Sequence, residues 1–170
     1  MSARDLCYTP AADLVRLYKS RACSPLEVMQ AVLARLDSVN PAVNACVTVA
    51  RESAPAEAKR GTAGLKRGRA LPPLFGVPVS IKDLTPTKGI RTTWGSKVHE
   101  HEVPKEDSLV VERLKAAGAI VFAKTNTPEF GAGGNTFNAV FGPTRNPWNP
   151  ALTCGGSSGG AAVALATGMG

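Results

Sequence analysis

The sequence lacks long hydrophobic segments. No run approaches the roughly 18 apolar residues that a membrane-spanning helix needs, and the first residues, Met-Ser-Ala-Arg-Asp, do not open the apolar segment of a signal peptide. Disulfide scaffolds are typical of much smaller secreted domains than a chain of 170 residues. We therefore expect a cytoplasmic protein, without a membrane partner, whose cysteines are mostly reduced.

Motifs for metals and nucleotides are also missing. Cys7, Cys23, Cys46 and Cys154 form no C-x-x-C pair, which argues against a zinc ribbon or a dithiol redox site. The P-loop spacing and the dinucleotide fingerprint are absent. The pair of histidines in His99–His101 has no third ligand nearby and gives weak support for a metal. The sequence predicts neither a metal nor a cofactor.

Aromatic residues are scarce, at 5% of the chain, while the net charge is +7. The densest basic patch covers Lys59–Arg60 and Lys66–Arg69, and no aromatic side chains are interleaved there for stacking on bases. A solvated basic loop is therefore favoured over a surface that binds nucleic acid directly. The apolar content of 44% is typical of a globular domain with a real core.

The N-terminal part is predicted to be helical. Ser24 can cap a helix in which Pro25 takes the first position and Glu27 completes a capping box. This helix is expected to end near Asn40–Pro41, and a shorter one to precede it over Ala11–Lys19. One face of the longer helix is apolar and comprises Leu26, Met29, Leu33 and Leu36.

A strand–helix–strand pattern follows. The apolar segments Leu74–Ile81 and Ala119–Ala123 are predicted to be buried strands, and the helix between them is opened by Asp107 or Ser108 and closed by Gly118. This order indicates a parallel pair in an α/β sheet. The other expected elements are a strand over Ala45–Val49, a weak helix over Glu52–Arg60, loops over Gly61–Pro73 and Glu129–Pro150, and a buried helix over Ala161–Ala166.

Two lysines follow the predicted strands at the edge where α/β sheets bind ligands. Lys82 and Lys124 could each be a solvated lysine or a desolvated base. Pairing with Asp83 would keep Lys82 charged, but neighbouring residues on a strand point to opposite faces. From the residues alone the two lysines cannot be told apart.

The glycine-rich segment Gly155–Gly160, of sequence Gly-Gly-Ser-Ser-Gly-Gly, leads into an Ala/Val run. Three interpretations stay open for it: a phosphate-binding loop before a helix, a flexible linker, and a turn that holds a serine for a catalytic relay.

Four segments in order resemble the amidase signature family of serine hydrolases. They are Gly76–Asp83 (Gly-Val-Pro-Val-Ser-Ile-Lys-Asp), Lys88–Ser96, Ala116–Phe130, and Phe141–Trp148 leading to the glycine-rich segment. The resemblance implies an α/β fold, with a helical N-terminal layer and part of a mixed, mainly parallel sheet flanked by helices. It implies that residues 1–170 are an incomplete amidase domain, the N-terminal third.

The resemblance also assigns roles in a Ser–cis-Ser–Lys triad. Lys82 matches the catalytic base, and Ser157 matches the bridging serine, whose preceding peptide bond is cis in the family. Gly131 matches a position that lines the substrate site together with Ser157. Lys124 matches a position without a catalytic role. The residues expected to support the turn around the bridging serine are Gly155, Gly156 and Ser158.

The family's nucleophilic serine and its oxyanion-hole amides lie in a segment expected beyond Gly170. The resemblance thus implies a full-length amidohydrolase that converts a small carboxamide to a carboxylate and ammonia or an amine. The 170-residue chain itself is expected to be inactive and to aggregate through an unpaired sheet edge. A homodimer stays open as its assembly.

Two alternatives to a free-standing amidase stay open. One is the glutamine-hydrolysing component of a tRNA-dependent amidotransferase complex, although Leu84 after Asp83 favours the free-standing type. The other is a non-catalytic module whose glycine-rich segment binds an anion.

Overall fold

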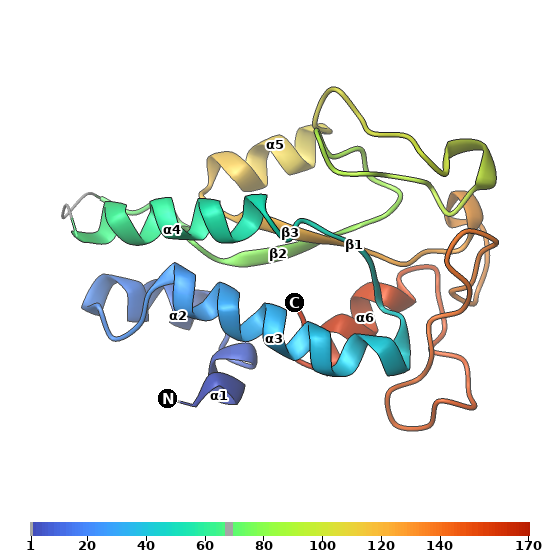
Figure 1. Cartoon of the computed structure of the whole chain (residues 1–170), viewed down its shortest axis with the longest axis horizontal. Helices are drawn as coiled ribbons and strands as arrows, with labels where there is room; N and C mark the ends of the chain where they lie inside the picture. Colours follow the sequence, from blue (N-terminus) through green and yellow to red (C-terminus); the bar gives the residue numbers. More distant parts are fainter. Residues whose placement is uncertain (1, 67–69) are drawn as a thin grey trace.

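A computed structural model describes residues 2–66 and 70–170. Figure 1 shows a small central sheet with helices on both faces. The helices are α1 (Ala3–Cys7), α2 (Ala11–Ser20), α3 (Pro25–Val43), α4 (Ser53–Lys66), α5 (Leu109–Ala116) and α6 (Gly159–Ala166), with short 3₁₀ turns η1 (Lys97–His99) and η2 (Glu129–Gly131). None of the helices found in this part of the chain is long and apolar enough to cross a membrane.

Among the described residues, the sheet has three strands in the order β1–β3–β2. Strand β2 (Pro78–Lys82) runs parallel to β3 (Ile120–Thr125), as the strand–helix–strand pattern predicts. Strand β1 (Cys46–Val49) pairs with β3 in the antiparallel direction, so the sheet is mixed. Because β2 and β3 are parallel, their carboxyl ends meet at one edge of the sheet, where Lys82 lies opposite Thr125.

Strand β3 is buried along its whole length and separates two apolar clusters. Ile120 and Phe122 face the larger cluster, to which α3, α4 and α6 also contribute. Val121 faces the opposite side and packs with Ile81 and with Val111 of α5. The alternation of side chains along β3 therefore places a layer of helices on each face.

Helix α3 begins as predicted but ends later. Ser24 and Glu27 form the reciprocal capping box, with Pro25 in the first position. The helix passes Pro41 and ends at Val43, because Asn40 closes the last turn: its carbonyl accepts from the Asn44 N–H at 2.7 Å, and its side-chain Oδ1 accepts from Cys46 N at 2.8 Å. Proline near a helix end removes one bond only.

Three other predicted boundaries are wrong. Helix α4 continues through Gly61 to Lys66, where a loop was expected; residues 67–69 of that loop lie outside the described residues. Strand β2 begins at Pro78, because residues 74–76 bond to the turn after α5 instead, with the Gly76 N–H donating to the Gly118 carbonyl at 2.8 Å. Strand β3 extends two residues beyond the predicted end, to Thr125.

The start of α5 is partly as predicted. Ser108 occupies the N-cap position, but its hydroxyl makes no capping bond. Asp107 instead accepts from the backbone N–H of Lys88 at 2.7 Å and from the Lys115 ammonium at 2.7 Å. Asp107 thus ties the loop after β2 to α5.

Replacing Ser24 by alanine should lower the free energy of unfolding by about 1 kcal/mol, because the capping bond to the Glu27 N–H is lost. Urea unfolding followed by circular dichroism measures the change. Ser24→Thr keeps the hydroxyl acceptor and serves as the control. Equal losses for both variants would contradict a capping role.

Candidate active site

The structure brings Lys82 and Ser157 together, although they lie 75 residues apart in sequence. Lys82 is the last residue of β2. Its Nζ lies 2.9 Å from Ser157 Oγ and 3.1 Å from Ser158 Oγ. Lys82 and Ser157 are half-buried, while Ser158 is exposed. A lysine amine within hydrogen-bond distance of a serine hydroxyl is the geometry that proton transfer between them needs.

The peptide bond between Gly156 and Ser157 is cis. This confirms the conformation that the family resemblance implied. The turn is held from outside by Thr136, whose hydroxyl donates to the Gly155 carbonyl at 2.9 Å and accepts from the Gly159 N–H at 3.0 Å. The segment is therefore packed against its neighbours, and the interpretation as a flexible linker is wrong.

Two glycines of this segment allow a close approach that no other residue could make. A Cβ on Gly159 would lie 2.4 Å from Thr136 Oγ1, and one on Gly160 would lie 2.4 Å from the backbone N of Asn126. The first turn of α6 is consequently pressed against the chain that leaves β3. This contact fixes the height of Ser157 relative to the edge of the sheet.

Burial lowers the pKa of the Lys82 ammonium from its ordinary value. The neighbouring Asp83 points to the other side of the strand. Its carboxylate accepts from the Thr93 hydroxyl at 2.5 Å and from the Thr93 N–H at 3.2 Å, and burial raises its pKa. Because the carboxylate of Asp83 is engaged by Thr93, it does not hold Lys82 in the charged form.

Lys124 lies one position before Thr125 on β3, and its side chain is completely buried. Its Nζ donates to the Thr85 carbonyl at 2.5 Å and to the hydroxyls of Thr87 and Thr92, both at 2.9 Å. Burial lowers the pKa of Lys124 to about 8, against an opposing effect of the Asp83 carboxylate. The structure thus separates the two lysines: Lys82 contacts the serines, and Lys124 contacts the loop after β2.

Gly131 lies at the end of η2 with φ of +72°. A Cβ there would lie 2.8 Å from Leu84 Cδ2, so Gly131 packs against a residue two positions beyond Lys82. Its role in lining a substrate site stays a prediction.

A network of buried polar side chains supports the site, and the sequence analysis missed it. Asn138 Nδ2 donates to Asn126 Oδ1 at 2.7 Å, and Asn126 Nδ2 donates to Thr144 Oγ1 at 3.0 Å. Thr136, in the same loop, holds the glycine-rich turn. The only signal in the sequence was the density of Asn and Thr within the predicted loop over Glu129–Pro150.

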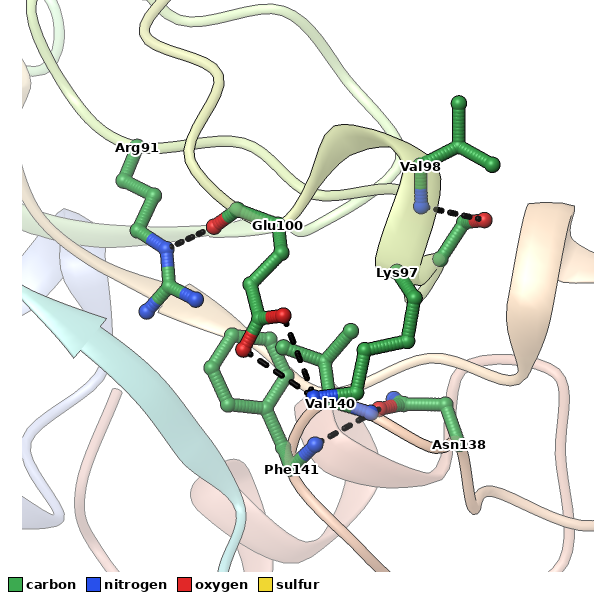
Figure 2. A network of polar contacts seen from close by, with 8 residues as sticks. Arg91, Lys97, Val98, Glu100, Asn138, Val140 and Phe141 are labelled. Atoms are coloured by element: carbon green, nitrogen blue, oxygen red, sulfur yellow. Dashed lines mark hydrogen bonds and ion pairs between the residues drawn. The ribbon is translucent and has the colours of Figure 1, made fainter.

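Figure 2 shows where this loop meets the loop after β2. Asn138 Oδ1 accepts from the backbone N–H groups of Val140 and Phe141 at 3.0 and 2.8 Å. The Arg91 guanidinium lies 5.0 Å from the centre of the Phe141 ring, and its Nε donates to the Glu100 carbonyl at 2.5 Å. Two long loops are thereby joined beside the edge of the sheet.

The histidines lie in the loop after β2, around η1. His99 Nδ1 contacts Glu102 Oε2 at 2.6 Å, and its ring lies 4.8 Å from that of Trp94. Within the residues that the structure describes, no three His, Cys, Asp or Glu side chains group in a way that could hold a metal ion.

Comparison with known proteins decides the family. The profile of the Amidase family matches residues 27–170, which is most of the chain. The chain belongs to the amidase family.

Relatives within the amidase family have different names. The chain is 44% identical over 164 residues to the protein of Carboxydothermus hydrogenoformans that forms the first, or A-type, component of glutamyl-tRNA(Gln) amidotransferase, covering 96% of this chain and 34% of that protein. It is 41% identical to an acylamidase of Rhodococcus erythropolis, covering 100% and 36%.

The fold matches solved amidases as well. A bacterial aryl acylamidase of the amidase signature family superposes with a TM-score of 0.88 at 32% identity, covering 95% of this chain and 34% of that one. The α/β fold class predicted from the sequence is thus confirmed. The chain spans about a third of the length of the relatives it matches.

The pKa of Lys124 predicts a pH dependence of stability. Since this pKa falls from 10.5 to about 8 on folding, the unfolded chain binds more protons between these values. The free energy of unfolding should therefore rise as the pH increases through that window, and the full cost of burying the cation is present below it. Urea unfolding at several pH values measures the slope, and Lys124→Met should reduce it. An unchanged slope in this variant would contradict the assignment.

Proposed function

We propose that the complete protein is an amidohydrolase that cleaves a small carboxamide to a carboxylate and ammonia or an amine. The observation that carries the proposal is the 2.9 Å contact between Lys82 Nζ and Ser157 Oγ in a chain of the amidase family. Residues 1–170 would form the first third of its catalytic domain. The remaining two thirds would supply the nucleophilic serine, the oxyanion-hole amides and most of the substrate pocket.

The proposed mechanism is a proton relay. Neutral Lys82 accepts the proton of the Ser157 hydroxyl while Ser157 accepts the proton of the nucleophilic serine, which attacks the amide carbonyl. The proton then returns through Ser157 to the leaving amine as the acyl-enzyme forms, and water releases the carboxylate. The lowered pKa of Lys82 favours this role, since it increases the fraction of neutral amine at neutral pH.

Two other functions have some support. The 44% identity to a component of glutamyl-tRNA(Gln) amidotransferase favours a protein that releases ammonia from glutamine within a multi-protein complex. Co-purification of partner proteins and a glutaminase activity that depends on them would discriminate this candidate from a free-standing amidase. A non-catalytic module that binds an anion at the glycine-rich segment would instead be stabilised by inorganic phosphate.

Location and assembly stay predictions. A cytoplasmic location is checked by cell fractionation, and a homodimer by light scattering of the purified protein.

Removing either member of the Lys82–Ser157 pair should abolish hydrolysis. With the protein expressed from its complete coding sequence, Lys82→Ala and Ser157→Ala should each lower kcat by about 10²–10⁴-fold, the usual contribution of general acid–base catalysis. The double variant should be no worse than the single ones, because relay members act as a unit. Product release from a panel of small amides and glutamine measures the rates.

Lys59→Ala is the matched control, since Lys59 is exposed on α4. Retention of more than about a tenth of wild-type kcat by Lys82→Ala would rule out the relay, as the expected loss is at least about 10²-fold. The isolated 170-residue chain should show no turnover and no cooperative unfolding, and clear turnover would place the nucleophile within it.

Gly131→Ala should raise KM for the amide substrate. The new Cβ would collide with Leu84 at 2.8 Å, and a φ of +72° costs a non-glycine residue about 1–2 kcal/mol. Gly134→Ala is the control, because a Cβ there meets no atom within 4 Å. Steady-state kinetics of both variants decide the point, and an unchanged KM in Gly131→Ala would remove Gly131 from the substrate site.

A further inference from the structure

Lys124 is a buried cation on β3, and the proposed relay does not use it. Its side chain is 0% exposed, and it lies opposite Ile81 in the pairing with β2, one position before the pair Lys82–Thr125. A lysine is rarely enclosed in this way unless its ammonium is well satisfied. The groups that satisfy it all belong to the segment that follows Lys82.

The three bonds of the Lys124 ammonium divide between a turn and a loop. The Thr85 carbonyl, at 2.5 Å, belongs to the turn that begins at Lys82, since the Thr85 N–H donates to the Lys82 carbonyl at 3.0 Å. The hydroxyls of Thr87 and Thr92, both at 2.9 Å, lie further along the same loop. An ammonium has three donors, and here one point of β3 holds three points of the chain that leaves the catalytic lysine.

Asp83 holds the same loop from within. Its carboxylate accepts from the hydroxyl and the N–H of Thr93, the residue after the last contact of Lys124. Asp83 and Thr93 are completely buried, as are Lys124 and its partners Thr87 and Thr92. The opposite charges of Asp83 and Lys124 favour each other in this enclosed space. The result is a closed polar box directly behind Lys82.

The box also reaches the predicted substrate wall. Leu84 lies inside the turn from Lys82 to Thr85, and it packs against Gly131, where an added Cβ would lie 2.8 Å away. A shift of the turn would therefore move both the base and a residue against Gly131.

We propose that Lys124 is a positioning residue for catalysis: by anchoring Thr85, Thr87 and Thr92 it holds the turn after β2 so that the Lys82 amine meets Ser157. The inference rests on the proposed amidohydrolase function. It assigns no proton transfer to Lys124, whose three donors are directed at the loop and not at the serines.

The test compares variants of the protein expressed from its complete coding sequence. Lys124→Met removes the three donors while keeping a long apolar side chain. With the turn released, kcat should fall by about 10²-fold, the cost of misplacing a catalytic group by roughly 1 Å. Thermal unfolding is recorded in parallel, and the rates are measured well below the unfolding temperature so that the loss is not one of folded protein. Lys59→Met, on exposed α4, is the control for removing a lysine.

A pair of threonine variants keeps the test decisive if Lys124→Met does not fold. Thr87→Val removes one acceptor hydroxyl without changing the shape of the side chain, and Thr87→Ser keeps it. The inference expects a lower kcat for Thr87→Val and rescue by Thr87→Ser. Wild-type kcat in Thr87→Val, or in a folded Lys124→Met, would overturn it.

Crystal structures of the same variants supply a readout that does not depend on activity. The distance from Lys82 Nζ to Ser157 Oγ should lengthen from 2.9 Å when the anchor is lost. An unchanged distance would overturn the positioning role. If the wild-type protein cleaves no amide, the proposed function fails, whereas the distances still decide whether Lys124 positions Lys82.

Discussion

Strands β2 and β3 run parallel and end together, and the arrangement of the site depends on this pairing. The register sets Lys82 opposite Thr125, so the chain leaving β2 and the chain leaving β3 start from the same edge of the sheet. One becomes the loop that carries Asp83 and the threonines around Lys124. The other leads through Asn126 to the loop that holds the glycine-rich turn. Both lysines reach this edge, but on different sides of it.

Hydrogen bonds, not apolar packing, shape what lies beyond that edge. The long loops contain few regular elements, and their buried polar groups must find partners within the protein. Asn126, Asn138 and Thr136 meet that need on the β3 side, and Asp83 with Lys124 on the β2 side. Such networks hold a site rigidly, because a group that loses its partner in an enclosed space pays the full cost of desolvation.

Membership of the amidase family does not by itself choose a substrate. A protein named as a component of an amidotransferase is 44% identical to this chain, and one named as an acylamidase is 41% identical. Both resemble it over nearly its whole length, so the part of the fold present here is shared between different functions. The contacts between Lys82 and Ser157 belong to this shared part, and we expect selectivity to reside elsewhere.

Local patterns in the sequence predicted several elements well. The capping box at Ser24, the strand–helix–strand order and the helix after Gly159–Gly160 all depend on neighbouring residues, and the structure confirms them. The ends of α3 and α4 and the start of β2 were wrong, because contacts such as Gly76 with Gly118 override local preference. The candidate pair Lys82 and Ser157 came from the resemblance to a family.

By itself, the sequence determined which segments form helices and strands and which residue types were available for chemistry. It could not distinguish Lys82 from Lys124, since both follow apolar strand segments. Tertiary structure decided between them: the register and the close approach of α6 direct one amine to Ser157, while the other is enclosed by Thr85, Thr87 and Thr92. The physical reason is that a lysine's pKa and partners are set by groups distant in sequence, which no local pattern encodes.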